Sequence, residues 1–226
     1  MKISEILLRK LIREVILFEL SNKFILKGLV YNMSDEPKKF ESMLETNHYS
    51  DIDEEILIDD PPSELERVKE LNLIKKQYNN KFNDESMLYR LDVEINELFD
   101  ELIIDSGFDS HIDLVKKIKS EISEIIYYHK EHFSCLRPKF LAKKHNIIFN
   151  SDDLESAESS AYPSGHAAQG YYIAYRLSDR FPLLRKEFLN LAKKISQSRL
   201  DRGVHFPSDI NSGKALAKKL YKKFKH

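Results

Sequence analysis

Glycine and proline are scarce in this chain, and their scarcity limits the folds that it can adopt. Its 226 residues include 6 glycines and 7 prolines. A β-sandwich or barrel needs many tight turns, which glycine and proline usually supply. The sequence therefore favours helices. A chain of this length can bury a substantial hydrophobic interior, either as one large domain or as a core with an appendage.

Apolar residues recur at helical spacing along most of the sequence, with turn signals between the periodic segments. The expected helices are residues 63–79, 85–105, 110–136, 166–179, 184–201 and 207–224. The predicted fold class is an all-α helical bundle. A further amphipathic helix is expected over residues 3–20, where it packs on the protein body or a second subunit, or docks on a membrane surface.

The double proline Pro61-Pro62 marks the expected domain boundary, because proline blocks a helix and biases the residue before it towards extended structure. Residues 1–60 are predicted to form an appendage, and residues 61–226 the helical core. Ser63 and the acidic residues after it indicate a capped helix start directly beyond the boundary.

Composition limits the partners and the compartment. The net charge of −1 makes no electrostatic case for nucleic acid as a partner. No apolar run reaches the roughly 18 residues of a membrane span, and charges interrupt any secretory signal near the N-terminus. The single cysteine, Cys135, excludes an internal disulfide and fits a reducing compartment. We expect a cytoplasmic protein without a transmembrane segment; a homo-oligomer formed through residues 1–20 stays open.

Lys130 and Arg137 are the first candidates for chemistry. If one helix runs through both, they lie two turns apart and point from its buried face. Two inward cations need an anion, and a phosphate would take Arg137 as a bidentate partner and Lys130 as a point charge. The alternative is that both extend to water or pair with carboxylates elsewhere. Pro138 is expected to end the helix.

A second candidate is the turn Pro163-Ser164-Gly165-His166, which precedes an apolar helix. Small residues at a helix start present free backbone N–H groups and the positive end of the helix dipole to an anion. Ser164 adds a hydroxyl, Gly165 allows close backbone approach, and His166 is a candidate general acid. The plainer interpretation is an ordinary turn and N-cap with an incidental histidine.

The third candidate is the segment from Ser198 to Asp209. Arg199 near a helix end offers a guanidinium fork, and His205 precedes Asp209 by four residues. That spacing lets Asp209 accept a hydrogen bond from one ring nitrogen of His205, which leaves the other nitrogen as an oriented nucleophile. A purely structural His–Asp pair is the alternative.

Together the three segments resemble the signature of the type 2 phosphatidic acid phosphatase superfamily. The pattern is lysine, six residues, arginine and proline; then Pro-Ser-Gly-His; then Ser-Arg, five residues, histidine, three residues and aspartate. That superfamily includes bacterial class A non-specific acid phosphatases, membrane lipid phosphatases and vanadium haloperoxidases. The class A enzymes are the most similar, and the resemblance covers roughly residues 61–222. Class A enzymes are typically exported, whereas no signal is seen here.

The resemblance implies a helical bundle of the acid phosphatase/vanadium haloperoxidase type and a metal-free, cofactor-free phosphatase acting on small phosphomonoesters. His205 would be the nucleophile that becomes a phosphohistidine, Asp209 would orient it, and His166 would be the general acid and base. The residues implied to bind phosphate are Lys130, Arg137, Ser164, Gly165 and Arg199. Vanadate would bind as a phosphate mimic.

Two alternative activities stay open. One is a vanadate-dependent haloperoxidase, whose phosphate-like cofactor would occupy the same pocket. The other is a lipid-phosphate phosphatase brought to a membrane surface by the N-terminal helix. A non-enzymatic anion sensor is a third reading, of a different class. The polar segment from Asn146 to Ser160 is expected to cover the pocket, and the physiological substrate is not encoded in the motifs.

Overall fold

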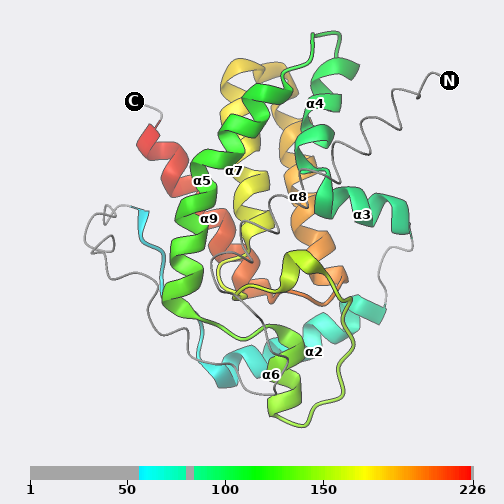
Figure 1. Ribbon diagram of the computed structural model, residues 1–226, viewed down its shortest axis with the longest axis vertical. Helices are drawn as coiled ribbons and strands as arrows, with labels where there is room; N and C mark the ends of the chain where they lie inside the picture. The colour runs from blue at the N-terminus through cyan, green and yellow to red at the C-terminus, as the bar shows by residue number, and fades with distance from the viewer. Residues whose placement is uncertain (1–55, 80–83, 225–226) are drawn as a thin grey trace, which may run out of the picture. The chain divides into compact units, whose positions relative to one another are not determined.

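The structure is a computed structural model that describes residues 56–79 and 84–224 (Figure 1). The chain divides into two units, Met1–Asn47 and His48–His226, and every described residue lies in the second unit. The helix expected over residues 3–20, and nearly all of the appendage expected over residues 1–60, fall outside the described residues. The domain boundary at Pro61-Pro62 stays a prediction.

Helices account for all the regular structure of the described residues, and the all-α class is confirmed. The α-helices are α2 (Glu64–Asn79), α3 (Glu85–Val93), α4 (Ile95–Asp105), α5 (Ile112–Phe133), α6 (Pro138–Lys144), α7 (Gly165–Arg180), α8 (Arg185–Asp201) and α9 (Pro207–Phe224). Two short 3₁₀ turns are η3 (Glu155–Ala157) and η4 (Pro182–Leu184). None of the helices in the described part of the chain is both long enough and apolar enough to cross a bilayer.

Helix α7 lies at the centre of the bundle and packs against α5, α8 and α9 (Figure 1). Its buried face is apolar or small, and at Gly170 the α7 backbone comes close enough to α8 that an added Cβ would lie 3.5 Å from Ala192 Cα. The four helices alternate in direction (Figure 1). One end of the bundle therefore collects the C-terminal ends of α5 and α8 and the N-terminal ends of α7 and α9. The N-terminal ends of α7 and α9 bring backbone N–H groups to this end, while the C-terminal ends of α5 and α8 contribute helix dipoles of the opposite sign.

The same end of the bundle is closed by α2 and α6, which pack against each other and share a small apolar cluster with the residue that precedes α9. The cluster consists of Leu71, Ile74, Leu141, Ala142 and Phe206. The expected helix start after the double proline is present: Ser63 Oγ accepts from Glu66 N at 3.4 Å, and Ser63 N donates to Glu66 Oε2 at 2.9 Å. This reciprocal cap fixes where α2 begins.

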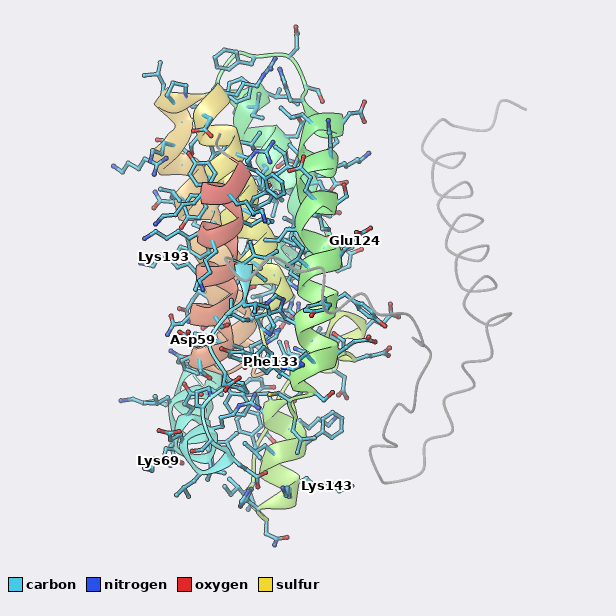
Figure 2. All side chains as sticks on the ribbon, turned by 90° about the vertical axis from the view of Figure 1, so that its left-hand side faces the viewer. Asp59, Lys69, Glu124, Phe133, Lys143 and Lys193 are labelled. Atoms are coloured by element: carbon cyan, nitrogen blue, oxygen red, sulfur yellow. The ribbon has the colours of Figure 1, made fainter. Side chains whose placement is uncertain are left out.

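Tyr162 ties the first described segment of the chain to the bundle. The Tyr162 hydroxyl donates to the carbonyl oxygen of Asp59 at 2.8 Å, and its ring meets Phe133 edge to face with centroids 5.2 Å apart. Figure 2 labels Asp59 and Phe133 in the lower half of the view, towards α2 and α6. Tyr162 thus fixes the approach to the turn that follows it.

Two expected helices differ from the structure. Residues 85–105 form two helices rather than one, because Glu94 leaves helical geometry at φ −109°, ψ 36°. Apolar residues keep helical spacing on both sides, so periodicity does not reveal this one-residue break.

The helix expected over residues 110–136 ends at Phe133, where Ser134 takes a left-handed conformation at φ 45°. Arg137 is the N-cap of α6, and Pro138 begins that helix instead of ending the previous one. A proline at the first helical position has the required φ and lacks only an N–H that would have no partner. The prediction that Lys130 and Arg137 share one helix face is therefore wrong.

Candidate active site

His205 and Asp209 form the expected pair at the start of α9. His205 Nδ1 lies 3.1 Å from Asp209 Oδ2, and both side chains are buried. On the other side of the ring, Arg137 Nη1 donates to His205 Nε2 at 2.8 Å. A guanidinium group only donates hydrogen bonds, so Nε2 carries the lone pair and Nδ1 carries the hydrogen shared with Asp209. This tautomer is the one that a histidine nucleophile needs.

Asp209 is held by more than its histidine. Its Oδ2 also accepts from the backbone N–H of Phe206 at 2.9 Å, and its Oδ1 accepts from Arg67 Nη2 at 3.2 Å. Arg67 comes from α2, is 5% exposed, and stacks on the Phe206 ring with its Cζ 4.4 Å from the centroid. Arg67 was not among the residues singled out from the sequence.

The two predicted cations Lys130 and Arg137 do meet, although from different elements. Lys130 lies in the last turn of α5 and donates to the carbonyl oxygen of Ser160, and Arg137 Nε donates to that of Ser159 at 2.8 Å. Arg137 Nη1 also donates to the carbonyl oxygen of Val204 at 2.9 Å. The irregular chain between Ser134 and Pro138 brings Arg137 back towards Lys130. We had expected one continuous helix to place the two side chains together.

The turn before α7 is built as a helix N-terminus. Ser164 Oγ caps α7 by accepting from Ala167 N at 3.4 Å, and Ser164 N donates to the carbonyl oxygen of Asp209 at 3.0 Å. A Cβ on Gly165 would lie 3.7 Å from Lys130 Cε, an ordinary contact, so the protein interior does not itself require glycine there. The expectation that Gly165 allows close backbone approach to an anion stays a prediction.

A second glycine matters more for this turn. An added Cβ on Gly213 of α9 would lie 2.4 Å from the carbonyl oxygen of Ser164, a distance that no real contact allows. The absence of a side chain at Gly213 lets the start of α7 rest directly on α9. Together with the hydrogen bond from Ser164 to Asp209, this contact sets the N-terminus of α7 beside the His205–Asp209 pair.

His166 and Arg199 meet on one carboxylate, that of Asp92 at the end of α3. His166 Nε2 lies 2.9 Å from Asp92 Oδ1 and 3.0 Å from the Asp92 carbonyl oxygen. Arg199 Nη1 lies 2.5 Å from the same Oδ1. Sequence periodicity gives Asp92 no distinguishing signal, because it is one acidic residue among several between Glu85 and Asp105. It was missed for that reason.

The polar segment before the turn contacts the candidate site, and its expected role as a cover over a pocket stays a prediction. Ser156 Oγ donates to Asp92 Oδ1 at 2.6 Å and accepts from Arg199 Nη2 at 3.0 Å. Arg202 Nε donates to Asp152 Oδ2 at 2.9 Å, which anchors the segment to the end of α8. Backbone carbonyl groups of the same segment meet Lys130 and Arg137, as described above.

Burial lowers the pKa values of three cations of the site. It lowers the pKa of Lys130 to about 7, with a further lowering from the positive charge of Arg137. Burial also lowers the pKa of Arg137 to about 10 and shifts the pKa of Arg199 down. A bound dianion would oppose these shifts, because a negative charge among cations favours their protonated forms.

The histidines and carboxylates are shifted as well. Burial lowers the pKa of His166 to about 4, assisted by the charge of Arg199, and lowers the pKa of His205 well below its ordinary range. Burial raises the pKa of Asp209 to about 7 against the opposing effect of Arg67. For Asp92, burial acts upwards, but the hydrogen bond from His166 and the charge of Arg199 outweigh it, so the pKa of that carboxyl is lowered.

The structure therefore brings every predicted site residue to one end of the bundle. Those residues are Lys130, Arg137, Ser164, Gly165, His166, Arg199, His205 and Asp209. Their chemical roles stay predictions. Arg67 and Asp92 join them from α2 and α3.

The family model described as the PAP2 superfamily matches residues 119–218. The family expected from the motifs is confirmed for this segment. All the predicted site residues lie within it, whereas Arg67 and Asp92 precede it.

Curated relatives match over part of the chain. A non-specific acid phosphatase from Salmonella typhimurium is 31% identical over 85 residues, which cover 38% of this chain and 34% of the relative. A non-specific acid phosphatase from Salmonella typhi is 29% identical, with the same coverage. The matched part thus spans about a third of the length of these relatives.

Among solved structures, a similar one is the crystal structure of a transmembrane PAP2-type phosphatidylglycerolphosphate phosphatase from Bacillus subtilis. It is 21% identical, has a TM-score of 0.44, and the similarity covers 72% of this chain and 87% of that one.

Proposed function

We propose that this protein is a phosphatase that hydrolyses phosphomonoesters through a phosphohistidine on His205, without a metal. The observation that carries the proposal is the hydrogen bonding of the His205 ring. Asp209 accepts a hydrogen bond from Nδ1, and Arg137 donates a hydrogen bond to Nε2. The lone pair of Nε2 therefore faces the cations that would bind a phosphate. The names of the curated relatives support the same class of activity.

The balance of charge supports phosphate as the ligand. Among the described residues, the site gathers the buried cations Lys130, Arg137, Arg199 and Arg67. The carboxylates that meet them are Asp209 and Asp92. A surplus of buried cations is costly unless an anion joins them. The N-terminal end of α7 adds backbone N–H groups and a positive dipole end to the same place.

These positions support the following first chemical step. The Nε2 lone pair of His205 attacks phosphorus while the bond from phosphorus to the ester oxygen breaks, and His166 gives that oxygen a proton. Arg137, which donates to Nε2 in the structure, would donate to a phosphate oxygen instead. Lys130 and Arg199 would meet the other oxygens, so that charge develops against donors already in place.

The second step reverses the proton transfer. His166 takes a proton from water, the water oxygen attacks the phosphohistidine, and the Nε2–phosphorus bond breaks to release inorganic phosphate. Asp209 would stabilise the positive charge on the His205 ring in the intermediate, as an aspartate does for the histidine of a serine triad.

The test is phosphate release from 4-nitrophenyl phosphate by the full chain, with and without a chelator. We expect activity that survives chelation, and a loss of roughly a thousandfold or more in His205→Ala with the fold retained. Rapid quenching under alkaline conditions should trap label from ³²P-phosphate ester on the wild type but not on the variant. Near-normal activity of His205→Ala, or its abolition by the chelator in the wild type, would contradict the mechanism.

A further inference from the structure

Asp92 makes contacts that the two-step mechanism above does not use. Its Oδ1 is shared by His166 Nε2 at 2.9 Å, Arg199 Nη1 at 2.5 Å and Ser156 Oγ at 2.6 Å. The Asp92 side chain is 9% exposed. A single carboxylate oxygen thus joins the candidate general acid to a candidate phosphate-binding arginine, and does so from α3, outside the family-matched segment.

The contacts around His166 determine which ring nitrogen holds a hydrogen. Both groups near Nε2, the carboxylate and the backbone carbonyl oxygen of Asp92, are hydrogen-bond acceptors. Nε2 must therefore carry the hydrogen. Nδ1 is then the nitrogen that gains or loses a proton, and no described residue is hydrogen-bonded to it. The ring is oriented in the manner of His205 and Asp209, with the two nitrogens exchanged.

Arg199 is positioned by the same carboxylate. Its Nη1 is engaged by Asp92 and its Nη2 by Ser156, while Nε is buried without a hydrogen-bond partner among the described residues. A buried donor without a partner is costly in a folded protein. An oxygen of a bound phosphate would satisfy Nε, and Asp92 would hold the guanidinium group in place while it does so.

We propose that Asp92 is the positioning residue of the general acid: it keeps the hydrogen of His166 on Nε2, presents Nδ1 to the leaving oxygen, and fixes Arg199 beside the phosphate. The inference rests on the proposed phosphatase activity and assigns a role to a residue that the motifs do not contain. Asp92 acts through His166 and Arg199 and does not itself touch substrate.

The test compares two esters that differ in their need for an acid. Glycerol 2-phosphate releases an alkoxide that must be protonated, whereas 4-nitrophenyl phosphate releases a stable phenolate. In Asp92→Asn the amide keeps the shape but loses the negative charge that supports a protonated His166. We expect kcat/KM to fall roughly 10- to 100-fold for the glycerol ester and less than about tenfold for the aryl ester. The ratio of the two rates does not depend on how much of the variant folds.

Two controls sharpen the comparison. Asp100→Asn removes another buried carboxylate, which binds His111 N at 2.6 Å and Ser110 Oγ at 2.7 Å, and it should leave the ratio unchanged. In a His166→Ala background, Asp92→Asn should change the ratio no further, because the acid through which it acts is gone. If Asp92→Asn gives no folded protein, Asp92→Glu can be tested in its place. Moving the carboxylate should also lower kcat/KM more for the glycerol ester than for the aryl ester.

An equal fall in kcat/KM for both esters would mean that Asp92 has a structural role only. A gain in activity or in phosphate affinity would mean that Asp92 competes with phosphate for Arg199. Either result would overturn the inference. A wild type that is inactive on both esters would instead refute the proposed function.

Discussion

Arg67 Nη2 lies 3.2 Å from Asp209 Oδ1, although the two residues are 142 positions apart in the sequence. Both side chains are buried. Without Arg67, the hydrogen-bond partners of the buried Asp209 carboxyl among the described residues would be His205 and the backbone N–H of Phe206. The contact therefore couples α2 to the acid–base state of the site.

Arg67→Met should destabilise the protein in a pH-dependent way. At pH 8 the Asp209 carboxylate is charged, and loss of its partner should lower the free energy of unfolding by about 3 kcal/mol. At pH 5 the loss should be smaller, because the pKa of Asp209 is raised to about 7 and the group is then neutral. Urea unfolding at both pH values measures this.

The matched control is Arg90→Met, which removes a more exposed arginine paired with Glu94 and Glu101. It should cost no more than about 1 kcal/mol at either pH. A loss for Arg67→Met that is the same at pH 5 and pH 8 would count against the coupling to Asp209.

Lys130→Met should stabilise the protein in phosphate-free buffer while weakening phosphate binding. The pKa of Lys130 is lowered to about 7, so the folded state holds this proton less tightly than the unfolded state. Lys130 therefore destabilises the fold most below pH 7, and the effect fades as pH rises towards its ordinary value. Methionine should add about 2 kcal/mol at pH 6 and much less at pH 10.

Exposed Lys193 provides the comparison: Lys193→Met should change stability by less than about 0.5 kcal/mol at both pH values. Phosphate titrations followed by thermal melting should show a stabilising effect in wild type and Lys193→Met that is lost in Lys130→Met. If Lys130→Met is less stable than the wild type at pH 6, the positive charge of Lys130 must stabilise the folded state, contrary to the lowered pKa.

Gly213→Ala should impair both stability and turnover. Its Cβ would lie 2.4 Å from the Ser164 carbonyl oxygen, so the start of α7 must move away from α9. We expect a loss of about 2 kcal/mol and a fall in kcat/KM of more than roughly tenfold. Gly170→Ala, whose Cβ would meet nothing nearer than 3.5 Å, should keep activity and gain up to about 1 kcal/mol. Similar behaviour of the two variants would argue against this close contact.

Vanadate should inhibit competitively and raise the melting temperature, because it resembles a phosphoryl group in transfer. Arg199→Lys keeps the charge but loses the planar fork, whose buried Nε has no hydrogen-bond partner within the described part of the chain, and vanadate should bind this variant about tenfold more weakly. Arg176→Lys, at an arginine paired with Glu121 instead, should bind vanadate as the wild type does. Equal affinities in all three proteins would place the oxyanion elsewhere.

Most of the helices follow from periodicity and caps, because the apolar stripes that bury them are local in the sequence. Helix breaks of one residue do not, as Glu94 shows. Lys130 and Arg137 were paired for a wrong geometric reason: the spacing of seven fits a helix, but Ser134 ends α5 and the chain returns by another path. Both side chains nevertheless reach neighbouring backbone carbonyl groups, those of Ser160 and Ser159, and their role in binding phosphate stays a prediction.

Arg67 and Asp92 mark the limit of prediction from this sequence. Each lies in a helix rich in charged residues. In the sequence of such a helix, a charged residue that forms a buried ion pair cannot be distinguished from one that faces solvent. Their partners are 142 and 107 positions away, and only the packing of α2 and α3 against α8 and α9 brings them together. No local signal encodes contacts of that kind.

Because Arg67 and Asp92 precede the family-matched segment, that segment is not a transplantable unit. A fragment that starts at residue 119 would keep every motif residue, yet it would leave Asp209 and Arg199 without their oppositely charged neighbours from α2 and α3. Grafting the motifs onto another helical scaffold would meet the same difficulty. Anyone who engineers this site must carry the first two core helices along with it.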